Sequence, residues 1–202
     1  MADAASLPTA VCGPRSASRT QNAVRTLRAC GSAVLLSFSL LFLLGAPSMS
    51  QADELPEYRL KAAFLYNFAL FTEWPADVGS LLNVCIVGRD PFGKEVDELQ
   101  GKAVGERSIA VLRKGANEPL KGCQVVFLPE SSVAGLPRML EELRDRPVLT
   151  VADCPSSAGQ GVALNMSVAQ NKVTFVANLQ AARAQRLNLS SKLLRLATKV
   201  RQ

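Results

Sequence analysis

The sequence predicts an α/β fold: a single layered domain with a largely parallel, Rossmann-like sheet, flanked by helices and with a C-terminal antiparallel hairpin. Three observations support this prediction. Short apolar runs alternate with helix-like segments after residue 53, which is typical of a parallel sheet covered on both faces. The 150 residues from 53 to 202 suit one ordinary domain. Near the end, two strand-like runs separated by residues 169–171 indicate the hairpin.

Residues 1–52 predict a cleaved signal peptide that precedes this domain. An apolar run of fourteen uncharged residues, 33–46, follows four arginines, and small residues at 50–52 fit a cleavage site before Asp53. A basic region, a short apolar core and small residues form the pattern of a secretory signal. The run is shorter than the roughly 20 residues that span a bilayer as a helix. We therefore expect an exported mature domain at 53–202, with no membrane span after processing.

The composition excludes several classes of function. The chain has no histidine, which removes Ser-His and Cys-His dyads, histidine-based zinc sites and the commonest general base. Four of the 23 basic residues and one of the 17 acidic residues lie in 1–52, so 19 basic and 16 acidic residues leave the mature chain at +3. This small charge removes the main support for nucleic-acid binding. We expect no catalytic residues, no metal and no cofactor.

The first predicted element is an apolar helix over residues 58–71. Apolar side chains recur there at helical spacing, and the only charged residues are Arg59 and Lys61. The helix is expected to end at Trp74-Pro75, because the residue before a proline resists helical geometry. So apolar a helix is either buried in the domain or covered by a partner, and both interpretations stay open.

Four short apolar runs predict buried strands, with helices between them. These strands are expected at 82–87, 108–112, 123–128 and 148–151. A helix over 91–99 follows Asp90, a good N-cap residue, and begins with a proline. Another helix is expected over 133–143, with Ser131 or Ser132 as its cap.

The end of the chain predicts the hairpin and two closing helices. The hairpin strands are 162–168 and 172–177. The closing helices are expected over 178–186 and 190–200. In the last one, Leu193, Leu196 and Val200 recur at helical spacing and are expected to face inward.

The cysteines are the main chemical signal in the mature chain. Cys12 and Cys30 leave with the signal region, so Cys85, Cys123 and Cys154 remain. An odd count in an oxidising compartment indicates one disulfide and one further thiol. Cys85 and Cys123 lie on strands that can be neighbours in a doubly wound sheet, so our hypothesis is a disulfide between them. Cys154 follows in a Ser/Gly-rich loop, where both a redox-active thiol and an inert residue are open interpretations.

Two aspartates are the best candidates for binding a ligand. Asp153 stands at a strand end, and Asp90 stands in the turn after the first strand. The carboxyl ends of strands are where α/β folds bind ligands. A turn-forming role is the alternative for Asp153, and Asp90 is also the predicted N-cap.

Several segments of the chain resemble motifs of the YfiR family. They are 58–68 with Phe71 and 73–75, 86–88 leading into 90–93, 147–151, and the closing 190–197. Together they cover about residues 57–200, which is almost the whole mature chain, and they occur in the family's order.

The resemblance implies a bacterial periplasmic protein of mixed α/β fold that binds the periplasmic domain of a membrane diguanylate cyclase and represses it. Cyclic-di-GMP, biofilm formation and motility would then respond to signals from the envelope. The resemblance also implies a capacity to form homodimers and a disulfide where Cys85 and Cys123 stand. A second family disulfide involves the loop near Cys154, and this chain has no second cysteine there.

Two hypotheses of function follow. In the first, the protein is a non-enzymatic regulator, and Phe71 and Trp74 at the end of the apolar helix bind the cyclase, since buried aromatic side chains are common interface hot spots. In the second, it is a periplasmic small-molecule sensor with another partner, and the ligand binds near Asp90 or Asp153. An enzyme is the weakest interpretation, because the sequence shows no catalytic constellation.

Overall fold

The computed structural model describes residues 54–169 and 172–202. The predicted signal peptide lies outside these residues. The strands are β1 (Thr72–Glu73), β2 (Leu81–Val87), β3 (Ala103–Val104), β4 (Arg107–Lys114), β5 (Val125–Pro129), β6 (Leu149–Asp153), β7 (Leu164–Ala169), β8 (Lys172–Asn178), β9 (Asn188–Leu189) and β10 (Lys199–Arg201). The helices are α1 (Glu54–Leu70), α2 (Lys94–Asp97), α3 (Leu136–Glu142), α4 (Leu179–Ala184) and α5 (Ser191–Leu194), with 3-10 turns η1 (Glu130–Gly135) and η2 (Pro155–Gly159).

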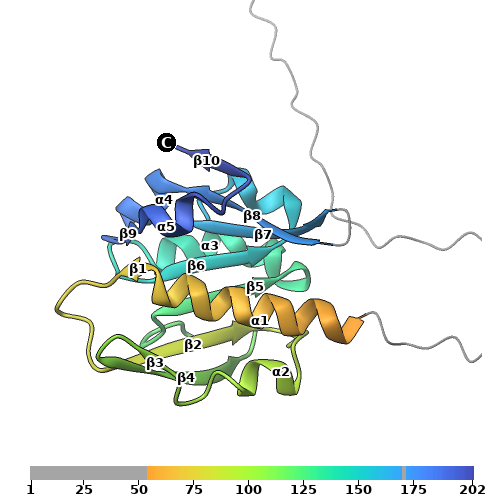
Figure 1. Cartoon of the computed structure of the whole chain (residues 1–202), viewed down its shortest axis with the longest axis horizontal. Coiled ribbons are helices and arrows are strands. Elements are labelled where there is room, and N and C mark those ends of the chain that lie inside the picture. Colours follow the sequence, from red (N-terminus) through yellow and green to blue (C-terminus); the bar gives the residue numbers. More distant parts are fainter. Residues whose placement is uncertain (1–53, 170–171) are drawn as a thin grey trace, which may run out of the picture. The chain divides into compact units, whose positions relative to one another are not determined.

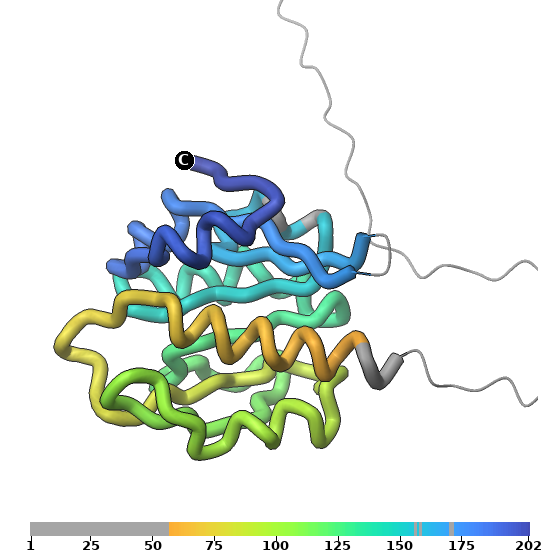
Figure 2. Tube along the Cα trace, viewed as in Figure 1, coloured from red at the N-terminus to blue at the C-terminus, as the bar shows by residue number. Residues whose placement is uncertain are grey.

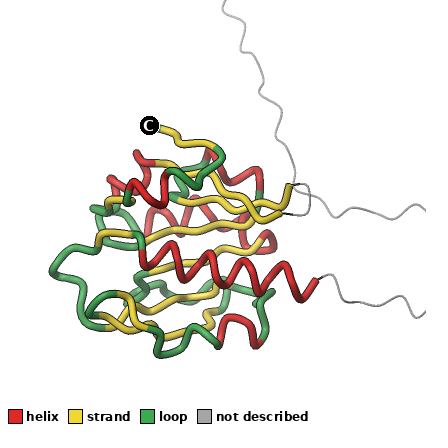
Figure 3. Tube along the Cα trace, viewed as in Figure 1, coloured by secondary structure: helices red, strands yellow, loops and turns green. Residues whose placement is uncertain are grey.

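One eight-stranded sheet organises the described part of the chain, in the order β10-β8-β7-β6-β5-β2-β4-β3. Strands β4, β2, β5, β6 and β7 run parallel to one another, whereas β3 pairs with β4 in antiparallel fashion and β7 and β8 form an antiparallel hairpin. The strands and helices alternate along the chain as Figure 3 shows. The predicted α/β class, the largely parallel sheet and the C-terminal hairpin are therefore confirmed.

Alternating side chains of the parallel strands supply two cores, one on each face of the sheet. In β2, Val84 and Ile86 pack in the core beneath α1, whereas Cys85 and Val87 pack in the core beneath α3. Successive residues of a strand point to opposite faces, so an unbroken apolar run fills both cores. Figure 1 shows α1 across the front of the sheet and α3 behind it.

Helix α1 is docked on the sheet by one side only. Leu65 and Phe68 are fully buried, and the ring centroid of Phe68 lies 4.9 Å from that of Phe175 in β8. The helix ends at Leu70, and the indole nitrogen Nε1 of Trp74 donates a hydrogen bond to the carbonyl oxygen of Ala69 at 2.9 Å. This bond satisfies one of the carbonyls that a helix leaves open at its C-terminal end. Figure 2 shows the helix as the orange segment.

Helix α2 is shorter than the predicted helix over 91–99. The carboxylate of Asp90 accepts a hydrogen bond from the backbone nitrogen of Phe92 at 2.7 Å. This bond closes a local turn, which aspartate side chains commonly form. The helix therefore begins at Lys94 and not at Pro91.

The predicted helix over 133–143 is divided into η1 and α3. Ser132 was one of the two expected caps, but its hydroxyl donates to the carbonyl oxygen of Val87 at 2.9 Å. No side-chain cap bond is present at the start of either helical piece. The serine instead fixes η1 to the end of the neighbouring strand β2.

The prediction of a helix over 190–200 is wrong beyond its first turn. Helix α5 ends at Leu194, and β10 then adds to the edge of the sheet, parallel to β8. Thr198 begins this pairing, since its backbone nitrogen and its hydroxyl both donate to the carbonyl oxygen of Phe175. Leu193 is buried as expected, but Leu196 exposes 66% of its surface and Val200 is also exposed.

Candidate functional site

The outward side of α1 carries an apolar stripe. We call Leu60, Phe64, Leu70, Phe71 and Trp74 the α1 stripe. Leu60 and Leu70 expose 45% and 38% of their surface, and the three aromatic residues are half-buried. Leu60 and Leu70 are the exposed members on α1, whereas Phe64, Phe71 and Trp74 also pack against the core beneath α1, and the last two follow the end of the helix. The interpretation of α1 as part of the domain core is confirmed for its inner side, and coverage of its outer side by a partner stays a prediction.

Phe71 and Trp74, the predicted partner-binding residues, also hold the end of α1 in place. The backbone oxygen of Phe71 accepts a hydrogen bond from Ser190 at 3.0 Å, and Trp74 bonds to α1 through its indole nitrogen. Leu60 and Leu70 present more exposed surface than these aromatics. The sequence analysis missed the two leucines, because a helix that is apolar on every side gives no signal of which side faces outward.

A charged cluster lies at the carboxyl end of β6, beneath the first half of α1. The ammonium Nζ of Lys61 contacts Asp153 Oδ2 at 2.6 Å and also pairs with Glu57. It lies 4.7 Å from the centroid of the Tyr58 ring. Burial opposes the charge on Lys61, but its hydrogen bonds to Asp153 and Glu57 outweigh that effect and raise the pKa of Lys61. Burial raises the pKa of the Asp153 carboxyl, and Lys61 offsets only part of this shift.

Asp90 belongs to a second, more exposed cluster. Its Oδ2 accepts a hydrogen bond from Arg113 Nε at 2.7 Å. The same guanidinium donates to Asp97 at 2.7 Å and to the carbonyl oxygen of Gly93 at 2.8 Å. The hydrogen bonds to Asp97 and Asp90 raise the pKa of Arg113. This network fixes α2 to β4 and uses both oxygens of Asp90, one for Arg113 and one for the turn.

Aromatic rings fill the part of the sheet edge near these clusters. The Tyr58 ring centroid lies 5.5 Å from that of Phe92, which in turn lies 4.6 Å from that of Phe127 in β5. Asp90 and Asp153 do stand at the carboxyl ends of parallel strands, as expected. Each carboxylate is engaged by a basic side chain of the same domain, and this arrangement favours structural roles for both.

The structure contains the disulfide between Cys85 and Cys123, with a Cα–Cα distance of 5.9 Å. It joins β2 to the residues that lead into β5, and these strands are neighbours in the sheet. Cys154 lies outside this disulfide and is fully buried. Buried cysteines are poorly reactive, so the burial of Cys154 favours the inert interpretation over the redox one.

Over residues 54–169 and 172–202, no group of three or more His, Cys, Asp or Glu side chains is arranged to hold a metal ion. Within those same ranges, no helix has the length and apolar character needed to cross a membrane.

A family model described as YfiR/HmsC-like matches residues 58–198. The chain belongs to the YfiR/HmsC-like family. The match runs from the first turns of α1 to the residue before β10, so it includes the α1 stripe, the disulfide and both ion clusters apart from Glu57. The family resemblance deduced from the motifs is thereby confirmed. Comparison with curated proteins found no match.

Membership of the YfiR/HmsC-like family gives the chain its general role. The family comprises periplasmic regulators of diguanylate cyclases, and it is regulatory and non-catalytic. A binding surface is therefore the feature to seek in this domain, and the α1 stripe is the apolar surface that the described helices offer for one.

Proposed function

We propose that this protein binds the periplasmic domain of an inner-membrane diguanylate cyclase and holds the enzyme inactive, which lowers cellular cyclic-di-GMP. The mature protein in this proposal is the domain at 53–202, released into the periplasm when the signal peptide at 1–52 is cleaved. Its action is stoichiometric binding without catalysis, and its readouts in the cell are biofilm formation and motility.

The α1 stripe carries this proposal. Leu60 and Leu70 keep large apolar side chains in solvent on a helix whose other side is firmly docked. Exposed apolar side chains that lie together on a surface mark interaction sites in soluble proteins. Half-buried Phe64, Phe71 and Trp74 add aromatic surface at low entropic cost, because the fold already restricts their side chains.

The small-molecule sensor remains the alternative, but it loses support at the residues first expected to carry it. A ligand at Asp90 or Asp153 would have to compete with Arg113 or Lys61. At Asp153 this competition is costly, because the ion pair with Lys61 is buried and the displaced charge would be left without a partner. The homodimer implied by the family resemblance stays a prediction.

Deleting the gene should raise cellular cyclic-di-GMP, and complementation with the wild-type gene should restore the original level. The physical reason is that a repressor acts by occupying the cyclase, so its loss releases the enzyme. Cyclic-di-GMP is measured in extracts by mass spectrometry over several growth and redox conditions. An unchanged level in all of them would contradict repression of a cyclase.

Leu70→Gln should abolish this complementation while the fold stays intact. Leu70 exposes 38% of its surface, so glutamine costs the fold little but places an amide where the partner requires an apolar contact. We expect at least ten-fold weaker binding, equivalent to about 1.4 kcal/mol. The measurement is cyclic-di-GMP in the complemented deletion strain, with immunoblots of periplasmic extracts to show equal amounts of each variant.

Leu112→Gln is the matched control for this experiment. Leu112 is 39% exposed, but its neighbour in β4, Val111, packs against the core beneath α1, so Leu112 points to the other face of the sheet. The control should complement fully. If Leu70→Gln complemented as well as Leu112→Gln does, the α1 stripe would not be the cyclase-binding surface.

A further inference from the structure

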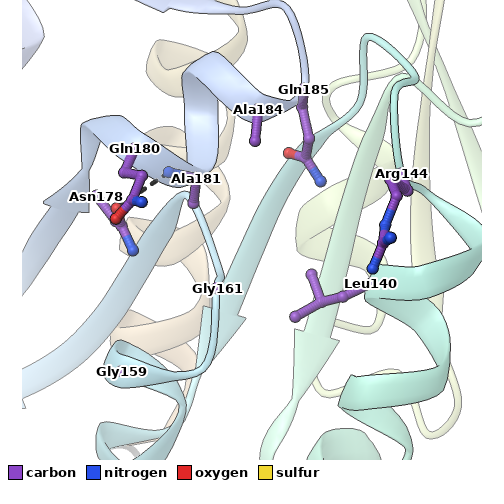
Figure 4. A pocket seen from close by; sticks show the side chains of 9 residues that line it. All are labelled: Leu140, Arg144, Gly159, Gly161, Asn178, Gln180, Ala181, Ala184 and Gln185. Carbon is purple, nitrogen blue, oxygen red and sulfur yellow. Dashed lines mark hydrogen bonds between the residues drawn. The ribbon is translucent and has the colours of Figure 1, made fainter.

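A hollow of about 350 Å³ lies between α3 and α4, away from the α1 stripe and the ion clusters. Its lining comes from α3, from the turn before β7, and from the end of β8 with α4. These residues are Leu140, Arg144, Gly159, Gly161, Asn178, Gln180, Ala181, Ala184 and Gln185. Figure 4 shows Leu140, Arg144, Ala184 and Gln185 bordering the space between the two helices. The volume falls in the range of small-molecule sites.

Gln185 places an unsatisfied hydrogen-bond acceptor at this hollow. The residue is only 5% exposed, and its side-chain oxygen Oε1 accepts no hydrogen bond from the described part of the chain. Figure 4 shows the amide directed from the end of α4 toward the space beside Leu140 and Arg144. A buried acceptor without a donor destabilises the folded state. A ligand that brings an N–H or O–H group to Oε1 would remove this destabilisation.

The charges around the hollow select the sign of the ligand. The guanidinium of Arg144 lines it and is otherwise held by Glu141 in an exposed ion pair, which is a weak interaction. Arg201 stands over the Gly159 wall, since a Cβ on Gly159 would lie 3.5 Å from its Nη1. Among the described residues that line the hollow, Arg144 is the one with a charge, and Arg201 places a second cation beside the hollow, which favours an anionic ligand.

The backbone shape keeps the hollow open. Gly161 has φ of 87°, and a Cβ there would lie 3.2 Å from Cδ1 of Leu140. Glycine adopts this left-handed conformation without strain, whereas other residues rarely do. Together with Leu140, the small residues Ala181 and Ala184 leave apolar walls between the polar groups, the usual composition of a ligand site.

We propose that the hollow between α3 and α4 binds a small organic anion that carries a hydroxyl or amide N–H donor, with the carboxylate on Arg144 and the donor on Gln185 Oε1. This proposal is independent of the cyclase and of the α1 stripe. The proposed ligand does not bind at Asp90 or Asp153, whose carboxylates are already paired. It binds at Gln185 Oε1, an acceptor that has no donor in the described part of the chain.

The test uses two matched pairs of probes on the mature domain. Lactate and N-acetylglycine carry a donor beside the carboxylate, whereas propionate and N-acetylsarcosine lack it. Binding is followed by NMR chemical-shift titration at millimolar concentrations. We expect the donor-bearing acids to shift the amide resonances of residues that line the hollow, and the two controls to bind at least five-fold more weakly. Equal binding within both pairs, or no shift with any probe, would overturn the proposal.

The variant Gln185→Met tests whether Gln185 binds a ligand or only stabilises the fold. Methionine keeps the length of the side chain and removes the buried amide, so the melting temperature should stay the same or rise. Affinity for N-acetylglycine should fall about ten-fold. Arg138→Ala is the control on α3, because Arg138 is exposed and bonds to Asn117 outside the lining. If Gln185→Met lowered the melting temperature and left the affinity unchanged, Gln185 would have a structural role only, and the proposal would be overturned.

Discussion

Replacing both Cys85 and Cys123 by alanine should lower the free energy of unfolding by about 4 kcal/mol. The disulfide closes a loop of 38 residues, and in the chain-entropy model its removal allows the unfolded chain many more conformations. The two cysteines are also buried in the core beneath α3, so smaller side chains add a modest loss of packing. The loss would be a large share of the 5–15 kcal/mol that a typical domain has.

Urea unfolding of the oxidised wild type, the reduced wild type and the Cys85→Ala/Cys123→Ala variant measures this effect. Reduction and the double substitution should agree to within about 1 kcal/mol, because both open the same loop. Cys154→Ala is the control: it removes one buried sulfur without opening a loop, at a cost of about 1 kcal/mol, the scale of one deleted methyl group. If reduction left the midpoint unchanged, the disulfide would contribute nothing to stability.

Lys61→Met should lower the free energy of unfolding by about 3–5 kcal/mol at neutral pH. The substitution leaves Asp153 buried beside Glu57 with no cation, and the cost is the desolvated charge that remains. Replacing both partners, as in Lys61→Met/Asp153→Leu, should restore most of the stability. The double variant has no carboxylate at position 153, so no buried charge is left there without a partner. Arg113→Met is the matched control in the exposed cluster, where we expect at most about 1 kcal/mol.

The pH dependence of the Lys61→Met variant gives an independent check. Lys61 lowers the pKa of Asp153, so its loss raises that pKa further above the ordinary value of 3.8. Between 3.8 and the raised pKa, the folded state binds a proton that the unfolded chain does not hold. Stability of the variant therefore increases as pH falls through this window. Its deficit relative to wild type should be largest at pH 7 and smaller near pH 4, as measured by urea unfolding at each pH.

A deficit that stayed constant from pH 7 to pH 4 would place the effect in packing and not in the charge of Asp153. Titration of Lys61 in the wild type does not contribute to the change in stability between pH 7 and pH 4. Its raised pKa means that Lys61 keeps its charge below pH 10.5 and loses it only above that value. Both pH values lie well below that limit, so the change in stability reports the aspartate.

The sequence alone determined the class of fold and much of its order. Unbroken apolar runs identified β2, β5 and β6 as buried strands, because a strand packed on both faces needs apolar side chains at every position. The hairpin of β7 and β8 followed from two such runs with a short connection. The helix over 178–186 was also predicted, and the structure shows that Asn178 caps it, since its side chain accepts a hydrogen bond from the backbone nitrogen of Ala181.

Other elements depended on contacts between distant parts of the chain. Residues 190–200 have helical periodicity, yet β10 forms because the open edge of β8 offers hydrogen bonds to whichever segment reaches it. Ser132 is a suitable cap by its residue type, but its hydroxyl donates a hydrogen bond to the carbonyl oxygen of Val87 instead. Local propensity is worth only tenths of a kcal/mol per residue, so one tertiary hydrogen bond can reverse it.

The candidate sites were harder to predict from the sequence than the fold. Lys61 and Asp153 are 92 residues apart, and nothing in either neighbourhood shows that the lysine lies beneath its helix and against the strand end. The outward side of α1 and the unsatisfied amide of Gln185 become visible only when the helices are placed. Side-chain periodicity reports how a segment folds, whereas the partner that a charge, an amide or an apolar surface meets is decided by the packing of the whole domain.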